Sequence, residues 1–102
     1  MEIKGETKPF ARYYHTACFV RARNEINSGS VIIHGGRDQQ IIHEDMFQLD
    51  LDSMRWSKLY CECPSLFSHT MVRVKRKLYV FGGIDISKGC ISNSLYIYEI
   101  GK

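Results

Sequence analysis

The feature that most constrains the fold of this chain is an internal repeat. Three short patterns occur twice, in the same order, along the 102 residues. Each copy has a His-Thr pair, an apolar run that ends in Gly-Gly, and a third segment rich in apolar and aromatic residues. The copies read HTACFV, VIIHGG and DMFQLDL, then HTMVRV, LYVFGG and SLYIYEI. Because the copies lie about 50 residues apart, we expect two copies of one structural unit.

Each copy is predicted to fold as β-strands. Residues 31–33 and 78–80 are uninterrupted apolar runs, which are typical of strands covered on both faces of a sheet. Residues 45–51 and 94–100 alternate apolar and polar side chains over most of their length, as half-buried strands do. No segment shows a helical period. The sequence therefore predicts an all-β fold in which each unit is a four-stranded antiparallel sheet that stacks on its neighbour.

The Gly-Gly pairs at residues 35–36 and 82–83 could be taken for phosphate-binding loops. A P-loop requires G-x-x-x-x-G-K-[ST] and a dinucleotide-binding loop requires G-x-G-x-x-G, each followed by a helix. Neither pattern is present, and strand-like segments follow both pairs. We therefore expect each pair to end a strand where a neighbouring backbone or ring comes close, with Phe47, Trp56 and Tyr96 as the rings.

These patterns resemble the kelch repeat. The resemblance covers about residues 12 to 100 and rests on His15-Thr16, VIIHGG, Asp45-Met46-Phe47 and Trp56 in the first unit, and on His69-Thr70, LYVFGG and Ser94-Leu95-Tyr96 in the second. It implies a β-propeller, typically of six blades with four strands each. It also implies that the chain binds other proteins, although a minority of the family are enzymes or parts of enzymes.

The chain is expected to divide into three parts. Residues 12–63 are predicted to form one kelch-like blade. Residues 64–102 are predicted to form a second blade that lacks its fourth strand, because the counterpart of Trp56 would lie beyond residue 102. Residues 1–11 form an N-terminal segment that can supply an outer strand of a preceding blade.

Two blades cannot close a propeller, which has about four to eight. An apolar blade face is therefore expected to be uncovered at each end of the pair. Three interpretations stay open. The chain is a piece of a longer protein, it assembles with copies of itself into a ring, or it requires a partner.

The leading functional hypothesis is a protein-interaction module. In related kelch proteins the loops at one face bind partners, and the resemblance places these residues there: Arg12, Tyr13, Tyr14, Arg37, Asp38, Gln39, Phe67, Asp85 and Lys88. Arginine pairs with carboxylates and phosphates, and aromatic side chains are enriched at binding hot spots. An acidic or phosphorylated peptide is therefore the expected ligand, with Arg12 and Arg37 as its main contacts. The competing interpretation of Tyr14 and Phe67 is that they pack between blades.

The alternative function is a fragment of a kelch-containing enzyme, either a galactose-oxidase-like propeller or a propeller domain attached to a catalytic domain. No Ser-His-Asp or Cys-His arrangement can be recovered from the spacing of residues. Cys61-x-Cys63 with His69 lacks the C-x₂₋₄-C spacing and the second ligand pair of structural zinc sites. We therefore expect no catalytic residue, no metal and no cofactor.

The histidines and one basic run are expected to be structural. His15 and His69 occupy matching positions of the two units, so both are predicted to be architectural. His34 takes the position of Phe81 and is expected in the core or on a blade face. The run RVKRK at residues 73–77 joins two predicted strands, so it is interpreted as a solvated hairpin rather than as a nucleic-acid-binding patch.

Composition favours the cytoplasm or the nucleus. The formal net charge of +3 is mild, and no apolar run approaches the ~20 residues of a membrane span. The N-terminus has no apolar segment of the kind found in signal peptides. The four cysteines are accordingly expected to be reduced, and no membrane is expected as a partner.

Overall fold

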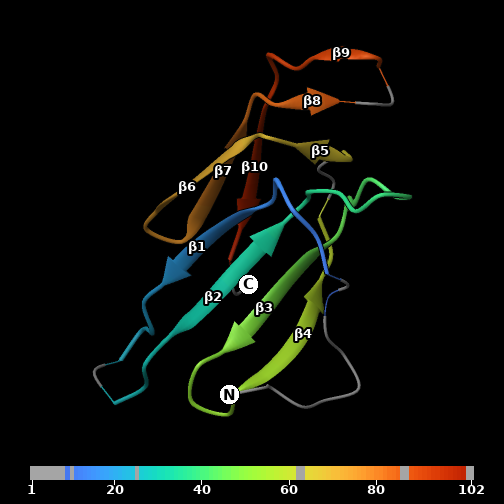
Figure 1. Cartoon of the computed structure of the whole chain (residues 1–102). Coiled ribbons are helices and arrows are strands. Elements are labelled where there is room, and N and C mark those ends of the chain that lie inside the picture. The colour runs from blue at the N-terminus through green and yellow to red at the C-terminus, as the bar shows by residue number, and fades with distance from the viewer. Residues whose placement is uncertain (1–8, 10, 25, 62–63, 86–87, 101–102) are drawn as a thin grey trace.

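The computed structural model describes residues 9, 11–24, 26–61, 64–85 and 88–100. These residues form strands and no helix, which confirms the all-β prediction. The strands are β1 (Thr16–Val20), β2 (Ser30–His34), β3 (Met46–Asp50), β4 (Arg55–Leu59), β5 (Leu66–Phe67), β6 (Thr70–Val74), β7 (Lys77–Phe81), β8 (Ile84–Asp85), β9 (Cys90–Ile91) and β10 (Leu95–Glu99). They make three antiparallel sheets, ordered β1-β2-β3-β4, β10-β7-β6 and β5-β8-β9 (Figure 1).

The first sheet is a meander in which neighbouring strands are consecutive in the chain. His34 at the end of β2 pairs with Thr16 in β1 and with Met46 in β3. Among the described strands, β4 pairs only with β3, where Trp56 lies opposite Leu49. This four-stranded sheet is the unit that the first copy of the repeat predicts.

The second sheet repeats the first three strands of the first. Strands β6, β7 and β10 take the places of β1, β2 and β3, and Phe81 is paired with both Thr70 and Leu95. The turn between β6 and β7 at Lys75 and Arg76 lies inside the basic run, as the hairpin interpretation predicted. Each of these two sheets has a Gly-Gly end, where β2 and β7 finish, and a hairpin end, where the turns after β1, β3 and β6 lie.

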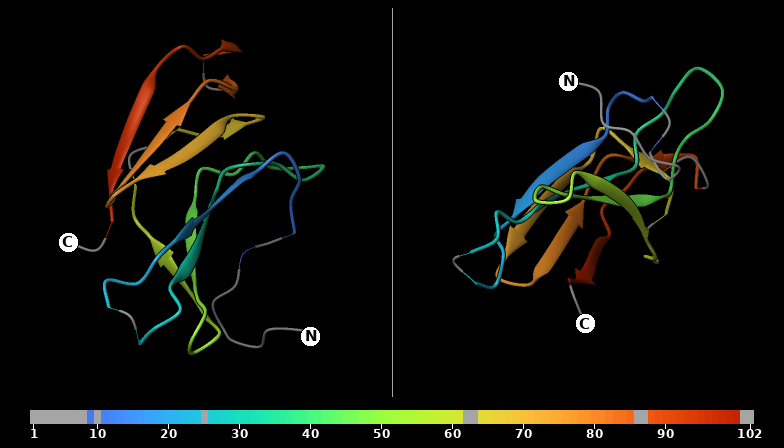
Figure 2. Two further views of the ribbon diagram at one scale, coloured as in Figure 1. Left: turned by 90° about the vertical axis from the view of Figure 1, so that its left-hand side faces the viewer. Right: turned by 90° about the horizontal axis from the view of Figure 1, so that it is seen from below.

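The two sheets stack face to face, with β1 against β6 (Figure 2). Side chains alternate between the faces of a strand, so every second residue of β1, β2, β6 and β7 points into the space between the sheets. The buried apolar cluster there consists of Val20, Ile32, Met46, Leu66, Met71, Leu78, Val80 and Ile100. Burial of this surface is the main non-directional force that joins the two sheets.

The opposite side of the second sheet, which we call the outer face, is apolar and uncovered in the described structure. Val72 is 56% exposed, Leu95 is 55% exposed and Ile97 is 55% exposed. Val72 and Ile97 flank Tyr79 in the strand register, and Leu95 pairs with Phe81, so these side chains form one continuous patch. Exposed apolar patches are typical of interaction surfaces and of surfaces prone to aggregation. The sequence also predicted an uncovered apolar face on the first sheet, on the side that points away from the second. The structure shows this only in part. Phe19 is 51% exposed there, but Ile33, Phe47 and Leu49 are buried.

The Gly-Gly pairs permit close approach, but not of the predicted rings. A Cβ atom at Gly36 would lie 2.8 Å from both the carbonyl oxygen of Tyr13 and the Cβ of His15. At Gly83 the equivalent distances, to Phe67 and His69, are both 2.7 Å. The expectation that Phe47, Trp56 and Tyr96 make these contacts is wrong. Those residues lie within the sheets, whereas the glycines lie beyond the strand ends, beside the segment that precedes β1 or β6.

The first glycine of the first pair, Gly35, serves the contact between the two sheets. A Cβ at Gly35 would lie 2.6 Å from both His69 Cε1 and the Leu66 carbonyl oxygen of the next sheet. At its counterpart Gly82 no atom of the described residues lies within 4 Å of such a Cβ. The backbone is left-handed at both glycines, with φ of 72° and 79°. Gly35 therefore requires glycine both for its left-handed backbone and for close packing, whereas Gly82 requires it for the backbone alone.

We predict that Gly35→Ala lowers the free energy of unfolding more than Gly82→Ala does. Both variants place alanine in the left-handed region, at a cost of about 1–2 kcal/mol. Only Gly35→Ala adds overlap with the next sheet, for a further cost of about 1–3 kcal/mol. Urea denaturation of the two variants measures the difference. Equal destabilisation would show that the sheets do not meet at Gly35.

Candidate binding surface

Three segments meet at the Gly-Gly end. Tyr13 and Arg37 exchange two backbone hydrogen bonds, each of 2.8 Å, which join the segment before β1 to the connection after β2. The backbone N–H of Ser68, just before β6, donates to the carbonyl oxygen of Tyr14 at 2.9 Å. Residues far apart in sequence are therefore held side by side by the main chain.

These segments bring together four of the predicted binding residues, which we call the aromatic cluster: Tyr13, Tyr14, Phe67 and Arg37. The rings of Tyr13 and Tyr14 are edge to face with centroids 4.9 Å apart, and Tyr14 lies 6.3 Å from Phe67. The Arg37 guanidinium lies over the Phe67 ring at 5.3 Å. Tyr13 is 44% exposed and Tyr14 is 58% exposed. The Tyr14 ring is thus mostly at the surface, while Phe67 is half-buried beneath it.

The backbone at Tyr14 is left-handed, with φ of 58°. A left-handed backbone in a tyrosine is strained, and strain of this kind often occurs at functional sites. Ser68, the matching residue of the second unit, has nearly the same φ of 57°. The conformation therefore belongs to the repeat, because each chain segment turns sharply before its histidine.

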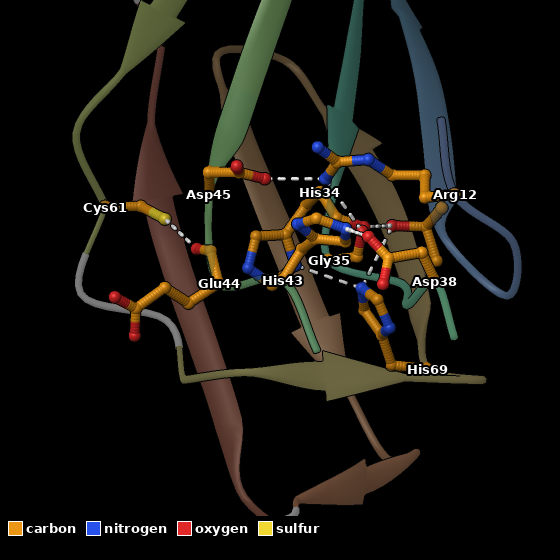
Figure 3. Close-up of polar contacts among 10 residues, drawn as sticks. Arg12, His34, Gly35, Asp38, His43, Glu44, Asp45, Cys61 and His69 are labelled. Atoms are coloured by element: carbon orange, nitrogen blue, oxygen red, sulfur yellow. Dashed lines mark hydrogen bonds and ion pairs between the residues drawn. The ribbon is translucent and has the colours of Figure 1, made fainter. Parts of the chain in front are cut away.

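The predicted role of Arg12 as a surface contact for a carboxylate is contradicted by its position. Its side chain is 3% exposed and forms an ion pair with Asp45 (Figure 3). It also donates to the Gly35 carbonyl oxygen at 3.0 Å and lies over the Phe47 ring at 5.8 Å. Arg12 thus ties the segment before β1 to the ends of β2 and β3.

Two aspartates predicted to contact a partner, Asp38 and Asp85, also have contacts within the chain. Asp38 Oδ1 accepts the backbone N–H groups of Gln40 and Ile41 at 2.7 and 2.8 Å, which hold the pKa of Asp38 below its usual value. Asp85 is fully buried, and its strand β8 pairs with β5 opposite Leu66, so the expectation that Asp85 faces a partner is wrong. Gln39 and Lys88 are exposed, Gln39 in the connection after β2 and Lys88 in the turn between β8 and β9.

A histidine pair joins the two sheets beneath this surface. His34 Nδ1 lies 3.0 Å from His69 Nε2, and one of the two nitrogens donates to the other. His69 Nε2 is also 3.2 Å from the Thr16 hydroxyl. Figure 3 shows His34 and His69 meeting beside Gly35. His69 is therefore architectural and His34 is a core histidine, as expected, whereas His15 at the matching position is exposed.

The predicted absence of a metal site concerns residues that the structure describes only in part. Cys63 lies outside the described residues. Among those that are described, no group of three His, Cys, Asp or Glu side chains could hold a metal ion.

Replacement of Arg12 by alanine should destabilise the fold, because Asp45 would lose its partner in a mostly buried site. The expected loss is about 3–5 kcal/mol, the range for breaking a buried ion pair. Arg37→Ala removes the same charge at the same end of the sheets and should cost only about 0.5–1 kcal/mol, the range for an exposed cation–π contact. Denaturant unfolding of both variants provides the comparison. A loss no larger for Arg12→Ala than for Arg37→Ala would contradict the structural role.

The stability of the fold should depend on the protonation of His69. Burial, and then the neighbouring His34, lower the pKa of His69 from 6.5 to about 4. Between these pH values the unfolded chain binds more protons at this site than the folded chain does. Stability contributed by neutral His69 is therefore present above pH 6.5 and is lost as the pH falls toward 4.

We expect this loss to be smaller in His69→Gln, when unfolding free energies are measured at several pH values from 4 to 7. His15→Gln, at the matching exposed position, should follow the parent protein. Parallel curves for the parent and His69→Gln would exclude this source of pH dependence.

No helix in the described ranges is long and apolar enough to cross a bilayer.

Comparison with known proteins agrees with this geometry. The Ras guanine nucleotide exchange factor F of Dictyostelium discoideum is 34% identical over 62 residues, which cover 59% of this chain and 6% of that protein. The tRNA wybutosine-synthesizing protein 2/3/4 of Arabidopsis thaliana is 32% identical over 100 residues, covering 95% of this chain and 9% of that protein. The Kelch repeat-containing protein 2 of Saccharomyces cerevisiae is 32% identical over 100 residues, which cover 90% of this chain and 11% of that protein. The chain thus spans 6% to 11% of the length of these relatives. The family model described as the KLHDC2/KLHL20/DRC7 Kelch-repeats domain matches residues 1–102, and the chain belongs to this kelch-repeat family.

Proposed function

We propose that the chain binds a partner protein through the aromatic cluster at the Gly-Gly end. Kelch repeats generally form propellers that mediate interactions between proteins, which is the general basis for this proposal. The observation that carries it is the gathering of Tyr13, Tyr14, Phe67 and Arg37 from three separate segments into one half-exposed surface. Tyrosine and arginine are the residue types that dominate binding hot spots.

Arg37 sets the chemistry of the partner. Its Nε donates to the carbonyl oxygen of Asp38 at 3.2 Å, and its guanidinium lies over the Phe67 ring at 5.3 Å from the centroid. Within the described residues, no carboxylate lies at ion-pair distance from it. A peptide with an acidic or phosphorylated residue next to an apolar one suits this surface, since the arginine can pair with the anion while the rings cover the apolar side chain.

A further blade covers the outer face of the second sheet in this proposal. The half-exposed Val72, Leu95 and Ile97 support this, as does the open space beside Gly82, where the first sheet receives His69 at Gly35. The blade comes from the same polypeptide or from a second copy of the chain. The mass of the native particle, compared with the mass of its denatured chain, distinguishes the two sources.

The alternative is that the propeller belongs to an enzyme or enzyme regulator. Relatives named as a guanine nucleotide exchange factor, a Rho GTPase-activating protein and a tRNA-modifying protein favour this alternative, since the chain matches only a small part of each. In that arrangement the propeller would serve as the binding domain beside a catalytic one. We place the chain in the cytoplasm or the nucleus, where Cys18 and Cys90, which form no disulfide, would stay reduced.

The experiment is differential capture of partners from cell extract, followed by titration of the partner that is identified. Tyr14→Ala and Arg37→Ala should each weaken binding by about tenfold or more, as loss of a hot-spot side chain does. Ile26→Ala is the control, since Ile26 is 91% exposed and lies at the hairpin end. A partner retained by the parent and by Ile26→Ala, but lost by the other two variants, supports the proposal. Equal binding by all four proteins, or loss confined to Ile26→Ala, contradicts it.

A further inference from the structure

A polar hollow lies at the hairpin end, opposite the aromatic cluster. It has a volume of about 200 Å³ and lies between the two sheets, below the apolar core. Its walls come mainly from the connection after β1, the ends of β2 and β3 with the turn after β3, and the turn after β6. The charged residues that line it are Arg21, Arg23, Arg76, Asp50 and Asp52.

Arg76 crosses from the second sheet to the first. Its Nη1 donates to the carbonyl oxygen of Arg21 at 3.3 Å. Its Nε is buried and has no hydrogen-bond partner. Burial, and then the positive charges of Arg23 and Arg73, lower the pKa of Arg76. A buried guanidinium N–H group without an acceptor in the protein leaves a position that an oxygen atom can fill.

The carboxylates of the hollow do not fill this role. Asp50 Oδ1 accepts the backbone N–H groups of Asp52 and Ser53. Both oxygens of Asp52 accept the backbone N–H of Ser28, at 3.1 and 3.0 Å. The aspartates thus shape the two loops. In the described part of the chain, no carboxylate lies at ion-pair distance from Arg76.

The charges near the hollow are mainly positive. Arg73, Lys75 and Lys77 flank Arg76 in the same hairpin, in addition to the arginines of the wall. Arg73 Nη1 donates to the carbonyl oxygen of Lys75 at 2.9 Å. Several cations held close together around a concave site attract an anion, which also relieves their mutual repulsion.

We propose that this hollow binds an oxyanion, a phosphate or carboxylate group of a partner, with Arg76 as its central contact. Arg76 would direct its unpartnered Nε at the bound oxygen. Arg21 and Arg23 on the facing wall would supply further positive charge. This site is separate from the aromatic cluster and would give the propeller a second binding surface at the hairpin end.

The test uses the full chain with two probes, inorganic phosphate and glutarate, which distinguish a phosphate from a carboxylate ligand. Side-chain N–H signals of arginine in NMR spectra should shift on titration, and the Nε–H of Arg76 should shift most. Arg76→Ala should weaken the affinity at least about tenfold, the effect of losing a hydrogen bond to a charged group. Lys75→Ala is the matched control, since it removes the same charge from the same turn, at an exposed position.

Loss of affinity in Arg76→Ala with near-parent affinity in Lys75→Ala supports the site, and the stronger probe identifies the anion. An equal loss in both variants would show a diffuse basic surface and overturn the proposal. Absence of a shift at Arg76 with either probe would also overturn it. So would binding that Arg37→Ala abolishes, since Arg37 lies at the other end of the sheets. The NMR spectrum of Arg76→Ala itself shows whether that variant is folded.

Discussion

The fit of His69 into the space beside Gly35 is the contact on which the pairing of the two sheets depends. Burial of apolar surface is non-directional, so the core between the sheets does not by itself select one alignment of the two sheets. At the Gly-Gly end, His69 reaches both His34 and Thr16 of the first sheet. The backbone N–H of Gly36 also donates to the Leu66 carbonyl oxygen at 2.8 Å. These polar contacts are directional and buried, so they specify how one blade sits on the next.

The aromatic cluster is a product of that alignment. Tyr13 and Tyr14 precede β1, while Phe67 belongs to the segment that precedes β6. They meet because the backbone bond from Ser68 to Tyr14 holds the two segments together. The first blade alone would lack Phe67, and the second blade alone would lack the other three residues of the cluster. Binding through the cluster would therefore require that the two sheets are stacked, which links recognition to the integrity of the blade contact.

The sequence predicted the features that repeat and missed those that do not. The two His-Thr and Gly-Gly motifs indicate stacked sheets and close approach, because both depend on short local patterns. The partner of Arg12 could not be recognised in this way, since Asp45 lies far along the chain and no spacing rule connects them. The neighbours of the glycines were misassigned for a related reason. Large aromatic rings such as Phe47 and Trp56 suggest close contact with the glycines. The strand register, which the sequence does not give, places these rings away from them.

The hairpin-end hollow was hidden from the sequence because its walls come from three turns. The basic run was recognised as a hairpin, but a linear pattern does not show that the turn faces the connection after β1. The burial of Asp85 was missed similarly, since it follows from the pairing of β8 with the two-residue strand β5.

The open space at Gly82 gives the stack of blades a direction. One side of each unit offers a histidine and the other offers a glycine, as the contact between His69 and Gly35 shows. His15 is exposed on the first sheet, and Gly82 is open on the second. A further blade can therefore add in only one orientation. Two units related by two-fold symmetry cannot pair through their glycine sides, because neither side supplies a histidine. Contacts of this head-to-tail kind build a ring when the rotation from one blade to the next closes, and an open array when it does not. In a ring built from this repeat, all blades would therefore face the same way around the axis, and a reversed blade would not match its neighbours.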